Sequence, residues 1–203
     1  IASAYLFDGP SGVGKELAAV SFATDVVARG NPHIIDRIEA GAHPDVRVFR
    51  PRDEGKRNIQ VEVLRGEILP LAQFAPFEAA SMFMIFPEAD VSFPSFQPEA
   101  ANALLKTLEE PRANVHFILT SERADSLLPT IRSRCQRIRF GRLPDVVLRE
   151  ILAAEDLPEQ TIDAAIALSA GRADVALALA RDGAVDELTA LVSSVDDAVR
   201  RGG

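Results

Sequence analysis

LFDGPSGVGKE, residues 6–16, nearly matches the phosphate-binding loop G-x-x-x-x-G-K-[ST]. Gly9 and four further residues precede the Gly-Lys pair that ends at Lys15, but Glu16 stands where the motif has serine or threonine. The apolar run AYLF (4–7) precedes the loop and a helical pattern follows it. This order predicts a strand, a tight turn and a helix, and it leaves open whether the chain uses ATP.

The loop glycines Gly9, Gly12 and Gly14 allow the backbone to turn tightly and to aim its N–H groups at phosphate oxygens, with Lys15 beside them. The alternative is a glycine-rich turn that binds no ligand. Glu16 is the difficulty, because the missing hydroxyl normally binds magnesium. A carboxylate about 5 Å from a phosphate oxygen costs about 3 kcal/mol at an effective dielectric near 20.

The second acidic motif of P-loop ATPases is an apolar strand that ends in Asp-Glu, where Asp supports magnesium and Glu activates water. Here the run MFMIF (82–86) ends in Pro87 and Glu88, so proline occupies the metal-supporting position. Asp90 lies too far beyond the strand to replace it. Two positions that would support one magnesium ion lack their usual side chains. This predicts a magnesium site that no longer functions, in which Glu88 is vestigial.

Apolar runs of strand length alternate with helical patterns through residue 142. Besides the two runs above, the predicted strands are VRVF (46–49), VHFILT (115–120) and the weaker QRIRF (136–140). The predicted helices are ELAAVSFATDVVARG, a segment from about Ile59 to Leu69, and PEAANALLKTLEEP (98–111). Such alternation predicts an α/β fold with a mostly parallel sheet covered by helices on both faces.

The pattern changes after residue 142 to Ala- and Leu-rich helices without a strand. We expect three or four helices there, from the segments DVVLREILAAE, PEQTIDAAIALSA, ADVALALAR and AVDELTALVSSVDDAVRR. We therefore expect an α/β domain over residues 1–142 and a small all-α domain over 143–203. Because the chain begins without Met on a strand-like run, we also expect the α/β domain to be truncated at its N-terminus.

Composition limits the possible functions. A formal charge of −8 argues against a protein that binds nucleic acid by itself. The single cysteine, Cys135, excludes an internal disulfide and a zinc site of several thiolates. His33, His43 and His116 lack metal-ligand spacing, and His116 is interpreted as a strand residue with its polar atoms satisfied, so no metal site is predicted. No apolar run is long enough for a membrane span, and a cytoplasmic protein is the default expectation.

Two arginines are candidates for contacts with phosphate. Arg134 lies in LLPTIRSRC (127–135), a short segment just before the last predicted strand. An arginine at a domain edge can stabilise transition-state charge at a neighbouring subunit's nucleotide, and the alternative is an ordinary surface arginine. Arg172 begins a predicted helix in SAGRADVALALA, which by itself is a weak signal.

Four segments, AYLFDGPSGVGK, IEAGAHPDV, AANALLKTLEEP and LLPTIRSRCQ, resemble in order the landmarks of the bacterial DNA polymerase III clamp-loader subunits of the AAA+ class. NALLKTLEEP followed by Ser-Arg-Cys is the specific part of this resemblance, which extends over nearly the whole chain. It implies an AAA+ P-loop domain followed by a small helical lid, with the oligomerising collar domain absent from this sequence. Subunits of this family form a pentameric ring that opens the sliding clamp and places it on primed DNA.

With Glu16 and Pro87, the chain looks like the delta-prime type of subunit, which commonly has a degenerate nucleotide site, rather than the gamma/tau motor type. The resemblance implies that Arg134 acts in trans as an arginine finger, and that Ser121 and Arg172 lie near sensors 1 and 2. It also implies gamma/tau and delta subunits as partners, contact with clamp and DNA through the complex, and a hetero-oligomer at full length. The chain would be a component of the DNA-directed DNA polymerase (nucleotidyltransferase) holoenzyme without ATPase activity of its own.

Family members usually carry a four-cysteine zinc module before IEAGAHPD. The corresponding segment here, ARGNPHIIDRIEAG (28–41), has no cysteine, so we predict that the zinc is lost and the loop shortened. No cofactor is expected, with ATP binding left open. Two alternatives remain: an ATP-hydrolysing gamma/tau-type motor in which Glu16 binds magnesium, and a binding module of another pathway that reuses the fold without a clamp.

Overall fold

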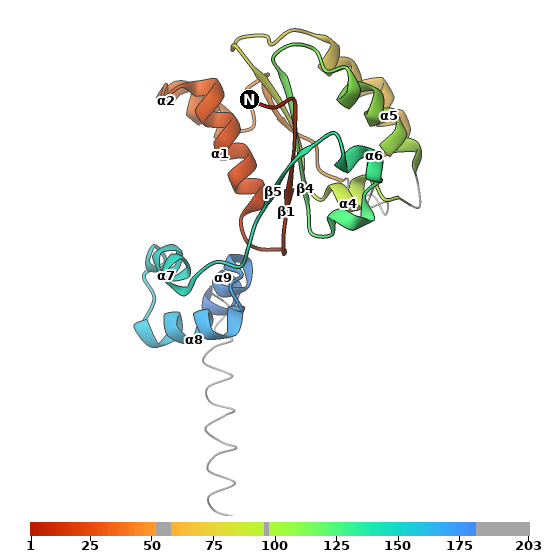
Figure 1. Cartoon of the computed structure of the whole chain (residues 1–203). Helices are drawn as coiled ribbons and strands as arrows, with labels where there is room; N and C mark the ends of the chain where they lie inside the picture. The colour runs from red at the N-terminus through yellow and green to blue at the C-terminus, as the bar shows by residue number, and fades with distance from the viewer. Residues whose placement is uncertain (52–57, 96–97, 182–203) are drawn as a thin grey trace, which may run out of the picture. The chain divides into compact units, whose positions relative to one another are not determined.

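The computed structural model describes residues 1–51, 58–95 and 98–181 (Figure 1). The chain divides into two compact units, one of residues 1–9 and 15–140 and one of residues 10–14 and 141–203. The first unit contains a sheet with helices, and the described part of the second is helical. The domain boundary predicted after residue 142 stays a prediction, close to this division.

A five-stranded parallel sheet forms the centre of the first unit, in the order β2-β3-β4-β1-β5. Its strands are β1 (Ala4–Asp8), β2 (Val46–Val48), β3 (Met82–Phe86), β4 (Val115–Ser121) and β5 (Gln136–Arg139). The α/β fold and all five predicted strands are thereby confirmed. Since β1 lies between β4 and the edge strand β5, the glycine loop that follows β1 starts at the sheet's carboxyl edge, one strand in from the β5 side.

Helices cover both faces of this sheet (Figure 1). On one face α1 (Lys15–Ala28) and α2 (Pro32–Glu39) pack in a core that includes Phe83 and Ile85. On the other face α5 (Pro98–Glu109) packs in a core that includes Met84 and Phe86. Successive side chains of β3 thus enter opposite cores, which explains why a strand buried on both sides reads as a continuous apolar run.

Two helical segments differ from prediction. The segment predicted as a shortened loop contains α2, whose start is stabilised by Asn31, since its side chain accepts a hydrogen bond from the His33 N–H at 3.1 Å. The helix expected from about residue 59 to 69 is divided into α3 (Val61–Val63), the π-helix η1 (Leu64–Ile68) and the 3₁₀ helix η2 (Leu69–Gln73). Pro70 in η2 has no N–H to donate, which disfavours a continuous α-helix there.

The remaining elements of the first unit are short: α4 (Ala89–Ser92), η3 (Ala124–Ser126) and α6 (Pro129–Arg132). The second unit contains α7 (Asp145–Ala153), α8 (Glu159–Ser169) and α9 (Ala173–Arg181), which share a core around Leu148 and Leu152. These three helices were predicted, and the predicted helix at 184–201 lies outside the described residues. No helix in the described ranges combines the length and apolar character that a membrane crossing requires.

Candidate functional site

The glycine loop begins directly after β1, beside the end of β4. The Gly9 N–H donates to the Ser121 carbonyl at 3.1 Å, and a Cβ at Gly9 would lie 2.2 Å from the carbonyl oxygen of Phe140. Glycine is therefore required at position 9 by close packing of the backbone. Lys15 is 8% exposed, and its ammonium donates to the Gly9 carbonyl at 2.9 Å. The lysine head group is held against the backbone of its own loop.

Glu16, in the first turn of α1, forms an ion pair with Arg50. Both side chains are well exposed, at 38% for Glu16 and 62% for Arg50, so the pair contributes little to stability. The carboxylate is nevertheless partnered by a cation of its own unit.

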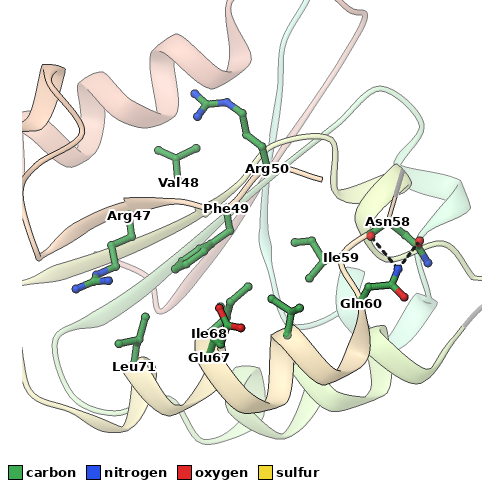
Figure 2. Close-up of a pocket in the computed structure, with 11 residues that line it drawn as sticks. Arg47, Val48, Phe49, Arg50, Asn58, Ile59, Gln60, Glu67, Ile68 and Leu71 are labelled. Carbon is green, nitrogen blue, oxygen red and sulfur yellow. Dashed lines mark hydrogen bonds between the residues drawn. The ribbon is translucent and has the colours of Figure 1, made fainter. Parts of the chain in front are cut away.

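Arg50 also lines a cavity of about 590 Å³ between the end of β2 and the segment 58–71 (Figure 2). The lining residues Arg50 and Asn58 flank residues 52–57, which the structure does not describe, so we assign no ligand to this cavity.

The acidic residues after β3 have separate surroundings. Glu88 is exposed with a φ of 49°, and its N–H donates to the Thr120 hydroxyl at 3.3 Å. Asp90 is buried and accepts from the Glu122 N–H at 3.3 Å, with the Arg123 Nε at 3.8 Å. Asp90 therefore fastens α4 to the segment after β4 and does not replace the carboxylate that Pro87 lacks. In the described ranges, no group of three or more His, Cys, Asp or Glu side chains could hold a metal.

Ser121, the predicted sensor-1 residue, is the last residue of β4 and is 1% exposed. Its hydroxyl accepts from the Arg123 N–H at 3.1 Å, and in the sheet it is in register with Asp8. Ser121 therefore lies beside the start of the glycine loop, and its hydroxyl caps the turn after β4. Its role as sensor 1 stays a prediction.

The rest of the loop belongs to the second unit, where it meets the start of α9. Gly12 and Gly14 have φ angles of 70° and 85°, which favour glycine. A Cβ at Gly12 would lie 1.7 Å from the Asp174 carboxylate, and the Gly12 carbonyl accepts from the Ala173 N–H at 2.8 Å. Arg172, the predicted sensor-2 residue, donates to both Asp174 oxygens, at 3.2 and 2.8 Å.

Sequence reasoning missed Asp174, although an acid in the first turn of a predicted helix is a common signal for a cap. The hydrogen bonds from Arg172 lower the pKa of this carboxyl, which keeps it charged. A carboxylate therefore lies against Gly12, and the Arg172 guanidinium has an acidic partner. Both features disfavour a phosphate at this part of the loop.

Arg134 lies in the turn between α6 and β5, in the first unit. Its guanidinium donates to the Thr130 carbonyl at 2.8 Å and forms an ion pair with Glu109 at the end of α5, while the side chain stays 32% exposed. The next residue, Cys135, packs against the core, and burial raises the pKa of its thiol to about 12. Cys135 thus anchors the turn, and Arg134 is held at the surface. Glu109 was not predicted as a site residue.

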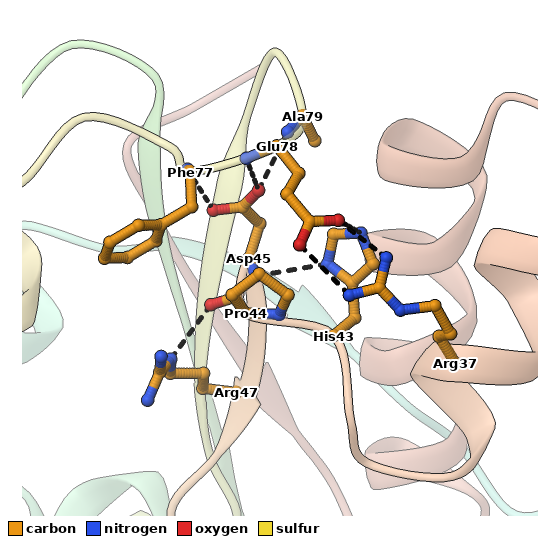
Figure 3. Close-up of polar contacts among 8 residues, drawn as sticks. All are labelled: Arg37, His43, Pro44, Asp45, Arg47, Phe77, Glu78 and Ala79. Carbon is orange, nitrogen blue, oxygen red and sulfur yellow. Dashed lines mark hydrogen bonds and ion pairs between the residues drawn. The ribbon is translucent and has the colours of Figure 1, made fainter.

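The segment GAHPDV has a structural role (Figure 3). Asp45 is fully buried and accepts hydrogen bonds from the N–H groups of Phe77, Glu78 and Ala79, at 2.6, 2.8 and 2.8 Å. The Asp45 N–H donates to His43 Nδ1 at 3.1 Å. These bonds join the start of β2 to the segment before β3.

His116, in β4, is buried, its Nδ1 lies 2.8 Å from the Ala2 carbonyl, and burial lowers its pKa. This agrees with its interpretation as a satisfied strand residue.

A sequence model of the family described as DNA polymerase III, delta subunit matches residues 1–144. The chain belongs to this family. It is 30% identical over 205 residues to the DNA polymerase III subunit delta' of Pseudomonas aeruginosa. This match covers 96% of this chain and 60% of that protein. It is 31% identical over 164 residues to the subunit delta' of Bacillus subtilis, covering 77% of this chain and 47% of that protein. The delta-prime-like character predicted from the motifs is confirmed, and the chain spans about half the length of these relatives.

Among solved structures, the chain is similar to a DNA polymerase III gamma subunit-related protein from Thermotoga maritima, with a TM-score of 0.56. Their sequences are 20% identical, and the match covers 89% of this chain and 53% of that one. At this identity the likeness concerns the fold alone. It confirms the AAA+ architecture.

Proposed function

We propose that this delta-prime-like chain is a stator of the replicative sliding-clamp loader. Its own nucleotide site does not turn over ATP, and it supplies Arg134 in trans to the ATP of an adjacent motor subunit. Its partners are gamma/tau and delta subunits, with the sliding clamp and primed DNA reached through the complex. It works in the cytoplasm as part of the DNA polymerase III holoenzyme. Membership of the DNA polymerase III family supports this assignment.

The observation that carries the proposal is the presentation of Arg134. A guanidinium has five N–H donors in a rigid plane. Within the described residues, two of these donate, one to Thr130 and one to Glu109, which leaves three for an anion. The side chain is 32% exposed, so an anion of another subunit can reach it. Arginine fingers of this kind accelerate phosphoryl transfer by about 10³- to 10⁵-fold at the site they serve.

Three features support a nucleotide site without turnover. Pro87 provides no carboxylate for magnesium at the end of β3. Glu16 replaces the hydroxyl of the motif and pairs with Arg50. In the second unit, the Asp174 carboxylate lies against Gly12. Each feature removes a magnesium ligand or adds negative charge where phosphate would bind.

A second candidate function, the ATP-hydrolysing motor, has two observations in its favour. Lys15 is retained in the loop, and Glu88 is exposed at the end of β3 in the water-activating position. In that case the purified chain would show magnesium-dependent ATP turnover that Lys15→Ala abolishes. Absence of turnover from the folded chain would exclude it.

The deciding experiment uses the full-length subunit in a reconstituted loader. Arg134→Ala should reduce clamp- and DNA-stimulated ATPase several-fold while the ring still assembles, because the catalytic charge is lost but the fold is not. Arg132→Ala is a matched control, since Arg132 lies in the same segment with 31% exposure and pairs with Asp125. Unchanged ATPase in an assembled Arg134→Ala ring would remove the finger role.

A further inference from the structure

The guanidinium of Arg134 is held by two acceptors that come from different elements. Its Nη1 donates to the carbonyl of Thr130, within α6, at 2.8 Å. Its Nη2 donates to Oε1 of Glu109, the last residue of α5. Two acceptors on two nitrogens fix the plane of the guanidinium as well as its position.

This second contact is poorly suited to a purely stabilising role. The side chains of Glu109 and Arg134 are 47% and 32% exposed, and exposed ion pairs contribute little to the free energy of unfolding. A carboxylate beside a residue that must bind phosphate also reduces the local positive charge. The contact therefore has a clear physical benefit only if the orientation of Arg134 matters.

We propose that Glu109 is a positioning residue for Arg134: it orients the guanidinium so that its remaining N–H donors meet the phosphate of the neighbouring subunit. This inference rests on the proposed finger role. A free arginine side chain occupies many rotamers, and ordering it during the reaction would cost activation free energy. Glu109 and Thr130 restrict these rotamers before the partner's nucleotide arrives.

The positioning role predicts a specific kinetic effect. In a loader rebuilt with full-length subunits, Glu109→Ala should lower kcat of the stimulated ATPase by about threefold, less than Arg134→Ala does, with KM for ATP unchanged, since the finger acts in the transition state. Glu109→Gln keeps an oxygen acceptor for Nη2 and should restore kcat to within about twofold of the wild type. Glu110→Ala is the matched control, because Glu110 is the adjacent exposed acid and should leave kcat unchanged.

A double variant tests whether Glu109 acts through Arg134. If it does, Glu109→Ala should cause no further loss of kcat in an Arg134→Ala background, because the residue it positions is gone. Ring assembly and the melting temperature of the subunit should be the same for all these variants.

The possible failures are distinguishable. Unchanged or increased kcat in Glu109→Ala, with a loss in Arg134→Ala, would overturn the positioning role and leave the finger role intact. A loss in Glu109→Ala that accompanies a lower melting temperature and poor ring assembly would make the contact structural and also overturn the inference. Unchanged kcat in Arg134→Ala would overturn both the inference and the proposed function.

Discussion

The glycine loop (residues 9–15) and the turn that holds Arg134 (residues 133–135, the arginine turn) both carry motifs of an ATP-hydrolysing ring. Their charged groups have different surroundings. In the first unit the ammonium of Lys15 donates to a carbonyl of its own loop, and in the second unit the Asp174 carboxylate lies against Gly12. The arginine turn instead holds Arg134 partly exposed, with two contacts that leave most of its donors for an anion. The charged groups beside each motif therefore differ, and they affect how well that motif can bind an anion.

The largest expected effect is a loss of ATPase activity that distinguishes the arginine turn from the glycine loop in a single assay. In the reconstituted loader, Arg134→Ala should slow turnover at the served site by about 10³-fold, measured as a several-fold loss of total ATPase. Under the proposed function, Lys15→Ala in the same subunit should leave total ATPase unchanged, because the proposal assigns no ATP turnover to its loop. The opposite pattern would reverse the comparison and assign the catalytic role to the loop.

The buried thiol of Cys135 in the arginine turn leads us to expect that the stability of the protein depends on pH. Burial raises the pKa of Cys135 from 9.0 to about 12, so the folded state retains the thiol proton more strongly than the unfolded state. The contribution of the protonated thiol to the free energy of unfolding is fully present below pH 9. It is lost as pH rises towards 12, by about 1.4 kcal/mol per pH unit.

Urea unfolding of the wild type and Cys135→Ala at several pH values between these limits measures the effect. The difference in slope between the two proteins isolates the thiol from tyrosine and lysine titration. Equal slopes would mean that Cys135 does not anchor the turn in a buried site.

Crowding at the glycine loop predicts a smaller loss of stability. Gly12→Ala should lower the free energy of unfolding by about 1 to 2 kcal/mol, because its φ of 70° strains a non-glycine residue and its Cβ meets Asp174. Combining Gly12→Ala with Asp174→Ala should recover the part due to the contact, which urea unfolding can measure. A double variant no more stable than Gly12→Ala would assign the whole cost to the backbone.

The smallest expected signal is the binding of ATP to the isolated chain. Calorimetric titration should show no binding up to about 1 mM ATP, with or without magnesium, which corresponds to less than about 4 kcal/mol of binding free energy. Circular dichroism on the same sample establishes that the protein is folded. Tight, magnesium-dependent binding would show that Glu16 and Pro87 do not disable the loop.

Much of the fold was predictable from local pattern. β3 and β4 were predicted because strands covered on both faces are continuous apolar runs, and α5 because its leucines repeat at helical spacing. α2 was missed although Asn31 and Pro32 are a recognisable helix start. The irregular helix around Pro70 could not be predicted from periodicity, since π and 3₁₀ turns share most of the helical pattern.

The order of residues alone shows which side chains are available: the glycines of the loop, Pro87 without a carboxylate, and Arg134 in its turn. Which of these side chains come into contact depends on how the folded elements pack. Glu109 pairs with Arg134 across 25 positions, and Arg50 pairs with Glu16 across 34. Such contacts follow from the packing of separate elements, which local spacing does not encode. Because a charge acts through its nearest partners, the chemistry of each motif depends on these long-range contacts.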